Sequence, residues 1–156
     1  MHDVESWRIG SPVPSAVALM TAVLIVDDDP SIGAAIDTLL HFRGYRTTYA
    51  ADAIAGTDAF NSIRFDLVVA DIFMPGENGL SMISRFHRAS PWVPVIAISG
   101  LRFRADGPRL DFLTMARKLG AASVLRKPFS PMELMSAIDA CLVQGAALDR
   151  TAQSKP

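Results

Sequence analysis

The stretch "VLIVDDDP", residues 23–30, decides the fold of this chain. Its four leading apolar residues, three of them β-branched, suit a buried β-strand. Three aspartates follow directly, although a structural turn needs one at most. Two unit charges ~4 Å apart repel by about 4 kcal/mol at an effective dielectric constant of about 20, so such a cluster either takes up a proton or holds a cation. The pattern predicts a strand that ends in a site lacking its positive partner.

The composition bounds the class of protein. The chain has 156 residues, the length of one ordinary domain, and is half apolar and one fifth charged, which is typical of a globular protein. A net charge of −1 gives no broad basic surface, so we expect no direct nucleic-acid partner. The single cysteine, Cys141, lies in an apolar helical stretch and is interpreted as a buried thiol.

The N-terminal residues do not indicate a membrane protein. The apolar run from 12 to 26 is shorter than the ~20 residues of a membrane span. The leading letters MHDVESWR mix acidic and basic residues and lack the positive flank of a signal peptide. We expect a cytoplasmic protein whose residues 1–20 form a loose extension. A signal or anchor segment, and a true start at Met20, stay open as alternatives.

Short apolar runs alternate with amphipathic stretches along the chain, which predicts an α/β fold with a doubly wound parallel sheet. Strands are expected at 22–26, 45–50, 66–70, 93–98 and 123–126. Helices are expected at 30–44, 52–63, from about 80, at about 109–119, and from 131. Ser130 and Glu133 form a capping-box pattern at the start of the last helix. We predict one domain over 21–146 and a disordered tail over 147–156.

Polar side chains follow four of these strands at the point where each strand ends. They are the run Asp27 to Asp29, Asp71, Ser99 and Lys127. Right-handed crossovers place all strand-to-helix loops at the carboxyl edge of a parallel sheet, where ligands bind in open α/β folds. Carboxylates suit Mg²⁺ or Mn²⁺, a lysine and a hydroxyl suit a phosphoryl group, and an aspartate can become an aspartyl-phosphate. The edge is therefore interpreted as a phosphoryl-transfer site.

Four motifs in this order resemble the receiver domain of two-component response regulators. They are "VLIVDDDP" (23–30), "DIFMPGENGL" (71–80), "PVIAISG" (94–100) and "RKPF" (126–129). Each motif is weak alone, but four in order at the ends of the expected strands are specific, and the resemblance covers about residues 21–145. It implies a flavodoxin-like (βα)5 fold with a five-stranded parallel sheet in the order 2-1-3-4-5.

The resemblance also implies a role for each residue at the edge. Asp71 would accept the phosphoryl group, Ser99 would hydrogen-bond that group, and Lys127 would pair with it. The implied ligands of Mg²⁺ or Mn²⁺ are Asp27, Asp28, Asp71 and the backbone carbonyl of Phe73. Asp29 is expected to cap a helix, and the peptide from Lys127 to Pro128 is expected to be cis.

The chain departs from the family pattern in three places. Val124 stands where the family often has Tyr or Phe, and it is too small and stiff for the inward ring movement linked to switching. The stretch LRFRADGPR, residues 101–109, is longer than usual, and we interpret it as a solvated loop rather than an RNA or acidic-partner contact. Phe73 and Leu101 stand where polar side chains help to place the hydrolytic water. Since neither can bond water, we hypothesise a slowly hydrolysing phosphoaspartate.

We expect a single-domain response regulator that takes its phosphoryl group from a histidine kinase or a histidine phosphotransfer protein. It would signal to a separate, unidentified protein through its fourth helix, fifth strand and fifth helix. No enzymatic activity is expected beyond its own phosphorylation and dephosphorylation at Asp71. One alternative is a scaffold that works without phosphorylation, which Val124 mildly favours. Another is a phosphatase with an aspartate nucleophile, but Phe73 occupies the place of its general acid.

Overall fold

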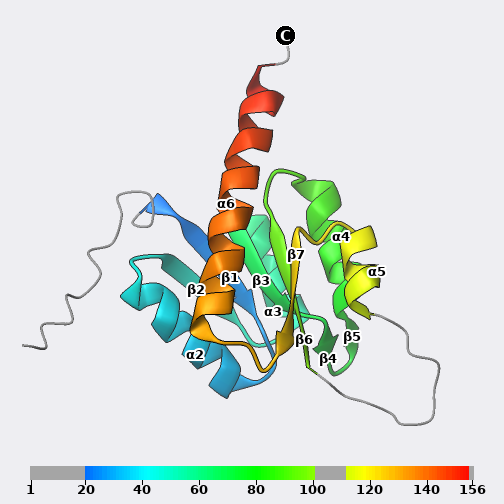
Figure 1. The fold of residues 1–156 in the computed structure, drawn as a ribbon. Coiled ribbons are helices and arrows are strands. Elements are labelled where there is room, and N and C mark those ends of the chain that lie inside the picture. The colour runs from blue at the N-terminus through cyan, green and yellow to red at the C-terminus, as the bar shows by residue number, and fades with distance from the viewer. Residues whose placement is uncertain (1–19, 101–111, 155–156) are drawn as a thin grey trace, which may run out of the picture.

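The computed structural model describes residues 20–100 and 112–154. The expected N-terminal extension, apart from Met20, and the long loop at 101–109 lie outside these residues. Helices and strands alternate around one sheet, as the apolar pattern predicts (Figure 1).

The central sheet has five parallel strands in the order β2-β1-β3-β6-β7. These are β1 (Ala22–Val26), β2 (Arg46–Ala50), β3 (Leu67–Asp71), β6 (Val95–Gly100) and β7 (Ser123–Lys127). Counted along the chain within this sheet, the order is 2-1-3-4-5, so the predicted flavodoxin-like topology is confirmed. Every residue of β1 and β3 is buried, which explains why these strands read as unbroken apolar runs.

Helices cover both faces of the sheet. They are α2 (Pro30–Phe42), α3 (Ala53–Ser62), α4 (Gly79–Ala89), α5 (Phe112–Lys118) and α6 (Pro131–Gln153). Alternate side chains of β1 serve two separate cores: Val23 and Ile25 belong to the core under α2 and α6. Leu24 and Val26 belong to the core under α3, α4 and α5. Within residues 20–100 and 112–154, none of the helices combines the length and the apolar character that a membrane span needs.

Local signals at the helix starts act as predicted. The Asp29 side chain accepts hydrogen bonds from the backbone N–H groups of Ser31 and Ile32, so Asp29 caps α2. At the start of α6, Ser130 and Glu133 form the reciprocal capping box. The peptide between Lys127 and Pro128 is cis. These three predictions are confirmed, and each places a residue next to the carboxyl edge of the sheet.

Residues 73–78 form a small hairpin, in a stretch where no strand was predicted. β4 (Phe73–Met74) pairs antiparallel with β5 (Glu77–Asn78). Pro75 and Gly76 make the turn, with a φ of +76° at Gly76, a pair typical of a type II turn. Strands of two residues each are too short to show an alternating pattern, so only the turn signal was visible.

The prediction of a disordered tail from residue 147 is wrong for the described part, because α6 continues to Gln153. The prediction rested on the lack of anything to bury. However, Ala, Leu, Arg and Gln favour helix, and propagating an existing helix costs little. The Gln153 side chain also donates to Asp149 one turn earlier, at 3.1 Å. Figure 1 shows the last turns of α6 projecting beyond the sheet.

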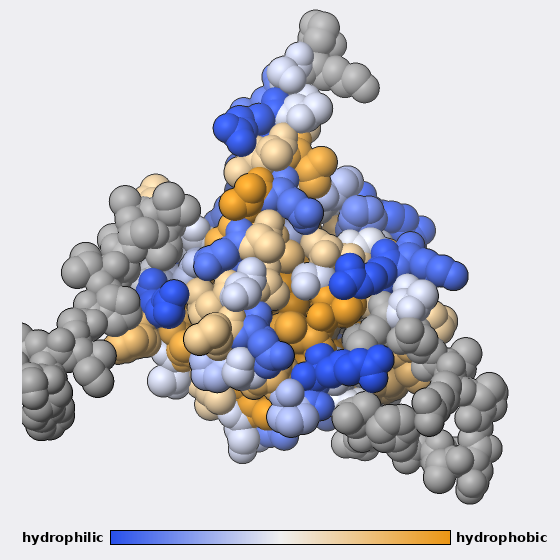
Figure 2. Space-filling model, in the orientation of Figure 1, coloured by the Kyte–Doolittle hydropathy of each residue, from blue (hydrophilic) through white to orange (hydrophobic). Residues whose placement is uncertain are grey.

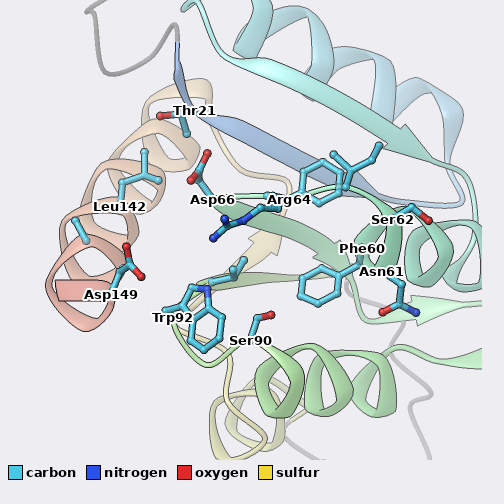
Figure 3. Close-up of a pocket in the computed structure, with 15 residues that line it drawn as sticks. Thr21, Phe60, Asn61, Ser62, Arg64, Asp66, Ser90, Trp92, Leu142 and Asp149 are labelled. Atoms are coloured by element: carbon cyan, nitrogen blue, oxygen red, sulfur yellow. The ribbon is translucent and has the colours of Figure 1, made fainter. Parts of the chain in front are cut away.

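A surface pocket of about 500 Å³ lies beside the outer half of α6. Figure 3 shows Leu142 and Asp149 of α6 on one side of it, facing Arg64 and Trp92 across the opening. Its lining includes residues that precede strands, such as Asp66 before β3. The pocket is therefore at the amino edge of the sheet, away from the predicted site residues.

Candidate phosphoryl-transfer site

The carboxyl ends of β1, β3 and β7 bring Asp27, Asp71 and Lys127 into direct contact. Lys127 Nζ donates to Asp27 Oδ2 at 2.9 Å and to Asp71 Oδ2 at 3.1 Å. Asp27 is 1% exposed and Asp71 is 4% exposed. A lysine that is distant in the sequence therefore supplies part of the positive charge that the aspartate run requires.

Backbone contacts fix the orientation of both buried carboxylates. Asp27 Oδ1 accepts from the Asp29 N–H at 2.9 Å, and the Asp27 N–H donates to the Ala50 carbonyl at 3.2 Å. Asp71 Oδ1 accepts from the Phe73 N–H at 3.0 Å. Each carboxylate thus has one oxygen on a backbone N–H and the other on Lys127, which leaves little freedom to rotate.

Asp28 completes a group of three carboxylates. Asp27, Asp28 and Asp71 each offer an oxygen atom, and these atoms all lie within 4.8 Å of one another. Three negative charges and the single positive charge of Lys127 leave a net charge of −2 in this group. A hard divalent cation such as Mg²⁺ matches both that charge and the oxygen ligands. The residues present therefore fit the metal, while the Phe73 carbonyl as a further ligand stays a prediction.

The ionisation of the pair follows from burial and charge. Burial raises the pKa of Asp71, and the nearby Asp27 charge adds to the increase, whereas the Phe73 N–H and Lys127 oppose it. For Lys127, burial lowers the pKa, but its hydrogen bond to Asp27 and the charges of Asp71 and Asp27 outweigh that, so the pKa is raised. Lys127 is therefore a cation at neutral pH. Additional positive charge near Asp71 would stabilise the ionised form of its carboxylate.

Ser99 lies at the end of β6, next to the acidic cluster but less constrained. Asp71 pairs with Ile98 across the sheet, which places Ser99 one residue further along the neighbouring strand. Its hydroxyl is buried and donates to the Gly100 carbonyl at 3.3 Å, its single hydrogen bond among the described residues. This bond is long for an O–H donor, so the hydroxyl can exchange it for a better acceptor at low cost.

The positions noted as departures are apolar in the structure as well. The Phe73 ring packs edge-to-face on Phe112, with ring centroids 4.7 Å apart at an interplanar angle of 80°. Val124 is half-buried in β7 and packs against the core on the α3, α4 and α5 side. Leu101, named for the same reason as Phe73, lies outside the described residues.

One contact of the site was not predicted from the sequence. The Tyr49 hydroxyl donates to the Asp27 backbone carbonyl at 2.7 Å. Tyr49 was expected only as part of the strand at 45–50. Its position one residue before the end of β2, beside the strand that carries the aspartates, is the signal that was available.

Comparison with known proteins identifies the class. A sequence model of the response regulator receiver domain matches residues 23–139. This match covers well over half of the chain, and the chain belongs to that family. The flavodoxin-like sheet and the acidic carboxyl edge are those of a receiver domain, and the predicted resemblance is confirmed.

Individual relatives agree with this assignment. The chain is 36% identical over 128 residues to the transcriptional activator protein PfeR of Pseudomonas aeruginosa, an alignment that covers 82% of this chain and 39% of PfeR. It is 31% identical over 120 residues to the DNA-binding response regulator MtrA of Mycolicibacterium smegmatis, covering 77% of this chain and 50% of MtrA. The chain thus spans half or less of the length of these two relatives.

A solved structure matches over nearly its whole length. The CheY-like response regulator receiver domain protein of Methanospirillum hungatei JF-1 superposes with a TM-score of 0.73 at 27% identity. The superposition covers 81% of this chain and 97% of that one.

Proposed function

We propose that this chain accepts a phosphoryl group on Asp71 from the phosphohistidine of a histidine kinase or histidine phosphotransfer protein. The observation that carries the proposal is the contact of one partly buried lysine, Lys127, with two buried carboxylates, Asp27 and Asp71, at the carboxyl edge of a receiver sheet. Lys127 and the carboxylates are then in place before any phosphoryl donor arrives.

In the proposed reaction, an Asp71 carboxylate oxygen attacks the phosphorus atom of the phosphohistidine. The P–O bond forms as the P–N bond breaks, and the leaving imidazole nitrogen keeps the bonding pair and takes a proton from solvent. The product acyl phosphate carries about 1.5–2 negative charges where the carboxylate carried one. Lys127 remains protonated throughout and pairs with the new oxygens, while Asp27 keeps the ammonium group in position.

Asp27, Asp28, Asp71 and the Phe73 carbonyl would hold Mg²⁺ or Mn²⁺, which when bound offsets negative charge on the transferring group. The other contributions come from the chain itself. The Phe73 N–H holds one Asp71 oxygen, so that only the oxygen facing Lys127 is presented to a donor. The rings of Phe73 and Phe112 pack on each other and carry no group that could activate water.

Phosphorylation would be signalled to a downstream protein through the surface formed by α5, β7 and α6. Ser99 would exchange its bond to Gly100 for a phosphoryl oxygen, which moves the end of β6 against β7. β7 is one of the two edge strands of the sheet and stays half-exposed, unlike the buried β1 and β3. Figure 2 shows apolar surface between α6 and α5 on this face. A downstream protein with a complementary apolar surface fits there.

We further propose that the protein is a cytoplasmic, single-domain regulator. It would signal to a separate protein and would not bind nucleic acid itself. The described residues, 20–100 and 112–154, form one receiver domain, and the net charge of −1 provides no broad basic surface. PfeR and MtrA are named as a transcriptional activator and a DNA-binding regulator, but this chain matches only part of each.

The test is incubation with acetyl phosphate and Mg²⁺, followed by intact mass spectrometry. We expect the wild-type protein to gain one phosphoryl group, and the Asp71→Asn variant to gain none. Asp58→Asn, which changes an exposed carboxylate on α3, is the matched control and should be modified like the wild type. Equal modification of Asp71→Asn would refute the assignment of Asp71. A wild type that takes up no phosphoryl group, from acetyl phosphate or from a histidine kinase, would favour the scaffold alternative.

A further inference from the structure

Tyr49 reaches the metal-binding loop from the neighbouring strand. The last ladder bond between β1 and β2 runs from the Asp27 N–H to the Ala50 carbonyl. The Asp27 carbonyl lies beyond that ladder and accepts from the Tyr49 hydroxyl at 2.7 Å instead. This carbonyl belongs to the peptide that links Asp27 to Asp28, and both residues are in the carboxylate cluster.

The Tyr49 ring occupies a space that Gly33 provides. A Cβ atom at Gly33, in the first turns of α2, would lie 2.3 Å from the Tyr49 ring. Gly33 is buried, and glycine inside a helix is a weaker helix former than alanine. Tyr49 is 38% exposed, so one side of it lies against α2 and the other faces solvent. Gly33 and Tyr49 therefore form a matched pair.

Asp28 depends on the backbone for its position. Asp27 is fixed by Lys127, by the Asp29 N–H and by Ala50. Asp28 is half-exposed, and among the described residues its carboxylate makes no hydrogen bond or ion pair. The orientation of the Asp27–Asp28 peptide thus decides where the third carboxylate points, and the Tyr49 hydroxyl is the group that holds that peptide.

We propose that Tyr49 is a positioning residue for the divalent cation, and that Gly33 is the space that lets its ring reach the loop. The inference rests on the proposed function, because it concerns the same cation site. It adds that cation affinity in this receiver depends on a side chain that is neither a ligand of the metal nor in contact with the phosphoryl group.

The first test compares Tyr49→Phe with Thr47→Val. Tyr49→Phe removes the hydroxyl and keeps the ring, while Thr47→Val removes another hydroxyl of β2 that bonds to α2, at Asp37, away from the cluster. Mg²⁺ binding is measured by calorimetry without any phosphoryl donor, and the rate of phosphorylation by acetyl phosphate is measured against Mg²⁺ concentration. We expect Tyr49→Phe to raise the Mg²⁺ dissociation constant about fivefold, the effect of one lost hydrogen bond, with an unchanged rate at saturating Mg²⁺. Thr47→Val should bind Mg²⁺ like the wild type.

The second test uses Gly33→Ala. Alanine is the better helix former, so a purely structural role predicts an unchanged or more stable protein with normal Mg²⁺ binding. We expect instead that the added methyl group displaces the Tyr49 ring and weakens Mg²⁺ binding as Tyr49→Phe does. The double variant, Gly33→Ala with Tyr49→Phe, should bind no more weakly than either single variant, because both remove the same bond.

The outcomes distinguish the role of Tyr49 from the proposed function. If the wild type binds Mg²⁺ and takes up the phosphoryl group but Tyr49→Phe has the same affinity, the role of Tyr49 is refuted and the proposed function stands. Equal weakening by Thr47→Val would likewise refute it, since the effect would then come from β2 in general. A wild type that binds no Mg²⁺ would overturn both.

Discussion

The two halves of the site differ in how firmly they are held. On one side, Asp27, Asp71 and Lys127 are fixed by hydrogen bonds at 2.9–3.1 Å, and the two carboxylates are almost fully buried. On the other side, the Ser99 side chain makes one hydrogen bond within residues 20–100 and 112–154, a long one of 3.3 Å to its neighbour's carbonyl. Both halves end strands of the same sheet, so the difference comes from their partners and not from the backbone.

The difference suggests that one half of the site is preorganised for phosphoryl transfer and that the other half responds to it. A fixed carboxylate–lysine half can receive a phosphoryl group without rearranging, which lowers the barrier to transfer. A loosely bonded hydroxyl can follow the new oxygens and move the end of β6 when charge arrives. The predictions below change one half at a time.

The largest effect is expected for Lys127→Met. Removing the ammonium group leaves two buried carboxylates facing each other without a cation, which should lower the free energy of unfolding by about 3 kcal/mol at neutral pH. Urea unfolding with and without Mg²⁺ measures this, and Mg²⁺ should restore part of the loss. Lys118→Met, on the exposed side of α5, is the control and should change stability by less than about 0.5 kcal/mol. A similar loss in both variants would mean that the fixed half does not depend on its lysine.

Ser99→Ala tests the responsive half. Because the bond that the structure describes for this hydroxyl is long, stability should change by less than about 0.5 kcal/mol in the same urea experiment. Phosphorylation by acetyl phosphate should slow by roughly tenfold or more, since a hydrogen-bond donor to the transferring group is lost. Ser99→Thr keeps the hydroxyl and should retain most of the rate. A large loss of stability in Ser99→Ala with an unchanged phosphorylation rate would contradict the view that Ser99 is the responsive half of the site.

Phe73→Asn should shorten the lifetime of the phosphoaspartate severalfold. The amide could bond the attacking water, which the Phe73 ring packed on Phe112 cannot do. The decay is followed by intact mass after removal of the phosphoryl donor. Phe73→Leu, apolar but not aromatic, should decay like the wild type. An unchanged lifetime in Phe73→Asn would refute the hypothesis of slow hydrolysis by lack of a polar group.

The smallest effect concerns Asp71 without metal. Because burial raises its pKa above the unfolded value of 3.8, ionised Asp71 destabilises the folded state as the pH rises through the folded pKa. Asp71→Asn should therefore raise the thermal midpoint at pH ~7 by a few degrees, as about 2–4 °C corresponds to 1 kcal/mol in a chain of this size. The gain should shrink as the pH falls towards 3.8. Asp58→Asn should change the midpoint little at either pH, and a constant gain for Asp71→Asn would contradict the role of ionisation.

Much of the fold could be predicted because strand and helix signals agreed along the chain. β1 has the predicted bounds, since its apolar run is closed by charge on one side. β3 extends one residue further than predicted, to Asp71, because the sheet ladder with β6 includes that residue. The hairpin at β4 and β5 and the last turns of α6 were missed for opposite reasons: the first is too short for periodicity, and the second forms without burial.

The candidate site was predictable in its residues but not in its contacts. Topology alone placed Asp27, Asp71 and Lys127 at one edge. That Lys127 bridges both carboxylates, and that Tyr49 holds the Asp27 carbonyl, depends on side-chain reach across neighbouring strands. A single sequence gives the residue types and suggests the strand register. It does not show which side chains are oriented to contact each other across neighbouring strands.

The length of α6 has a consequence for how the domain opens. Its buried residues, Leu134, Met135, Ile138 and Cys141, all lie in the first half, and each residue over 146–154 is exposed. The helix is roughly 35 Å long at the usual rise per residue, so its far end is stabilised by its own hydrogen bonds alone. The free energy of opening therefore differs between the two ends of this one helix. Amide hydrogens at its start should exchange only when the whole domain unfolds, whereas those at its end should exchange by local fraying.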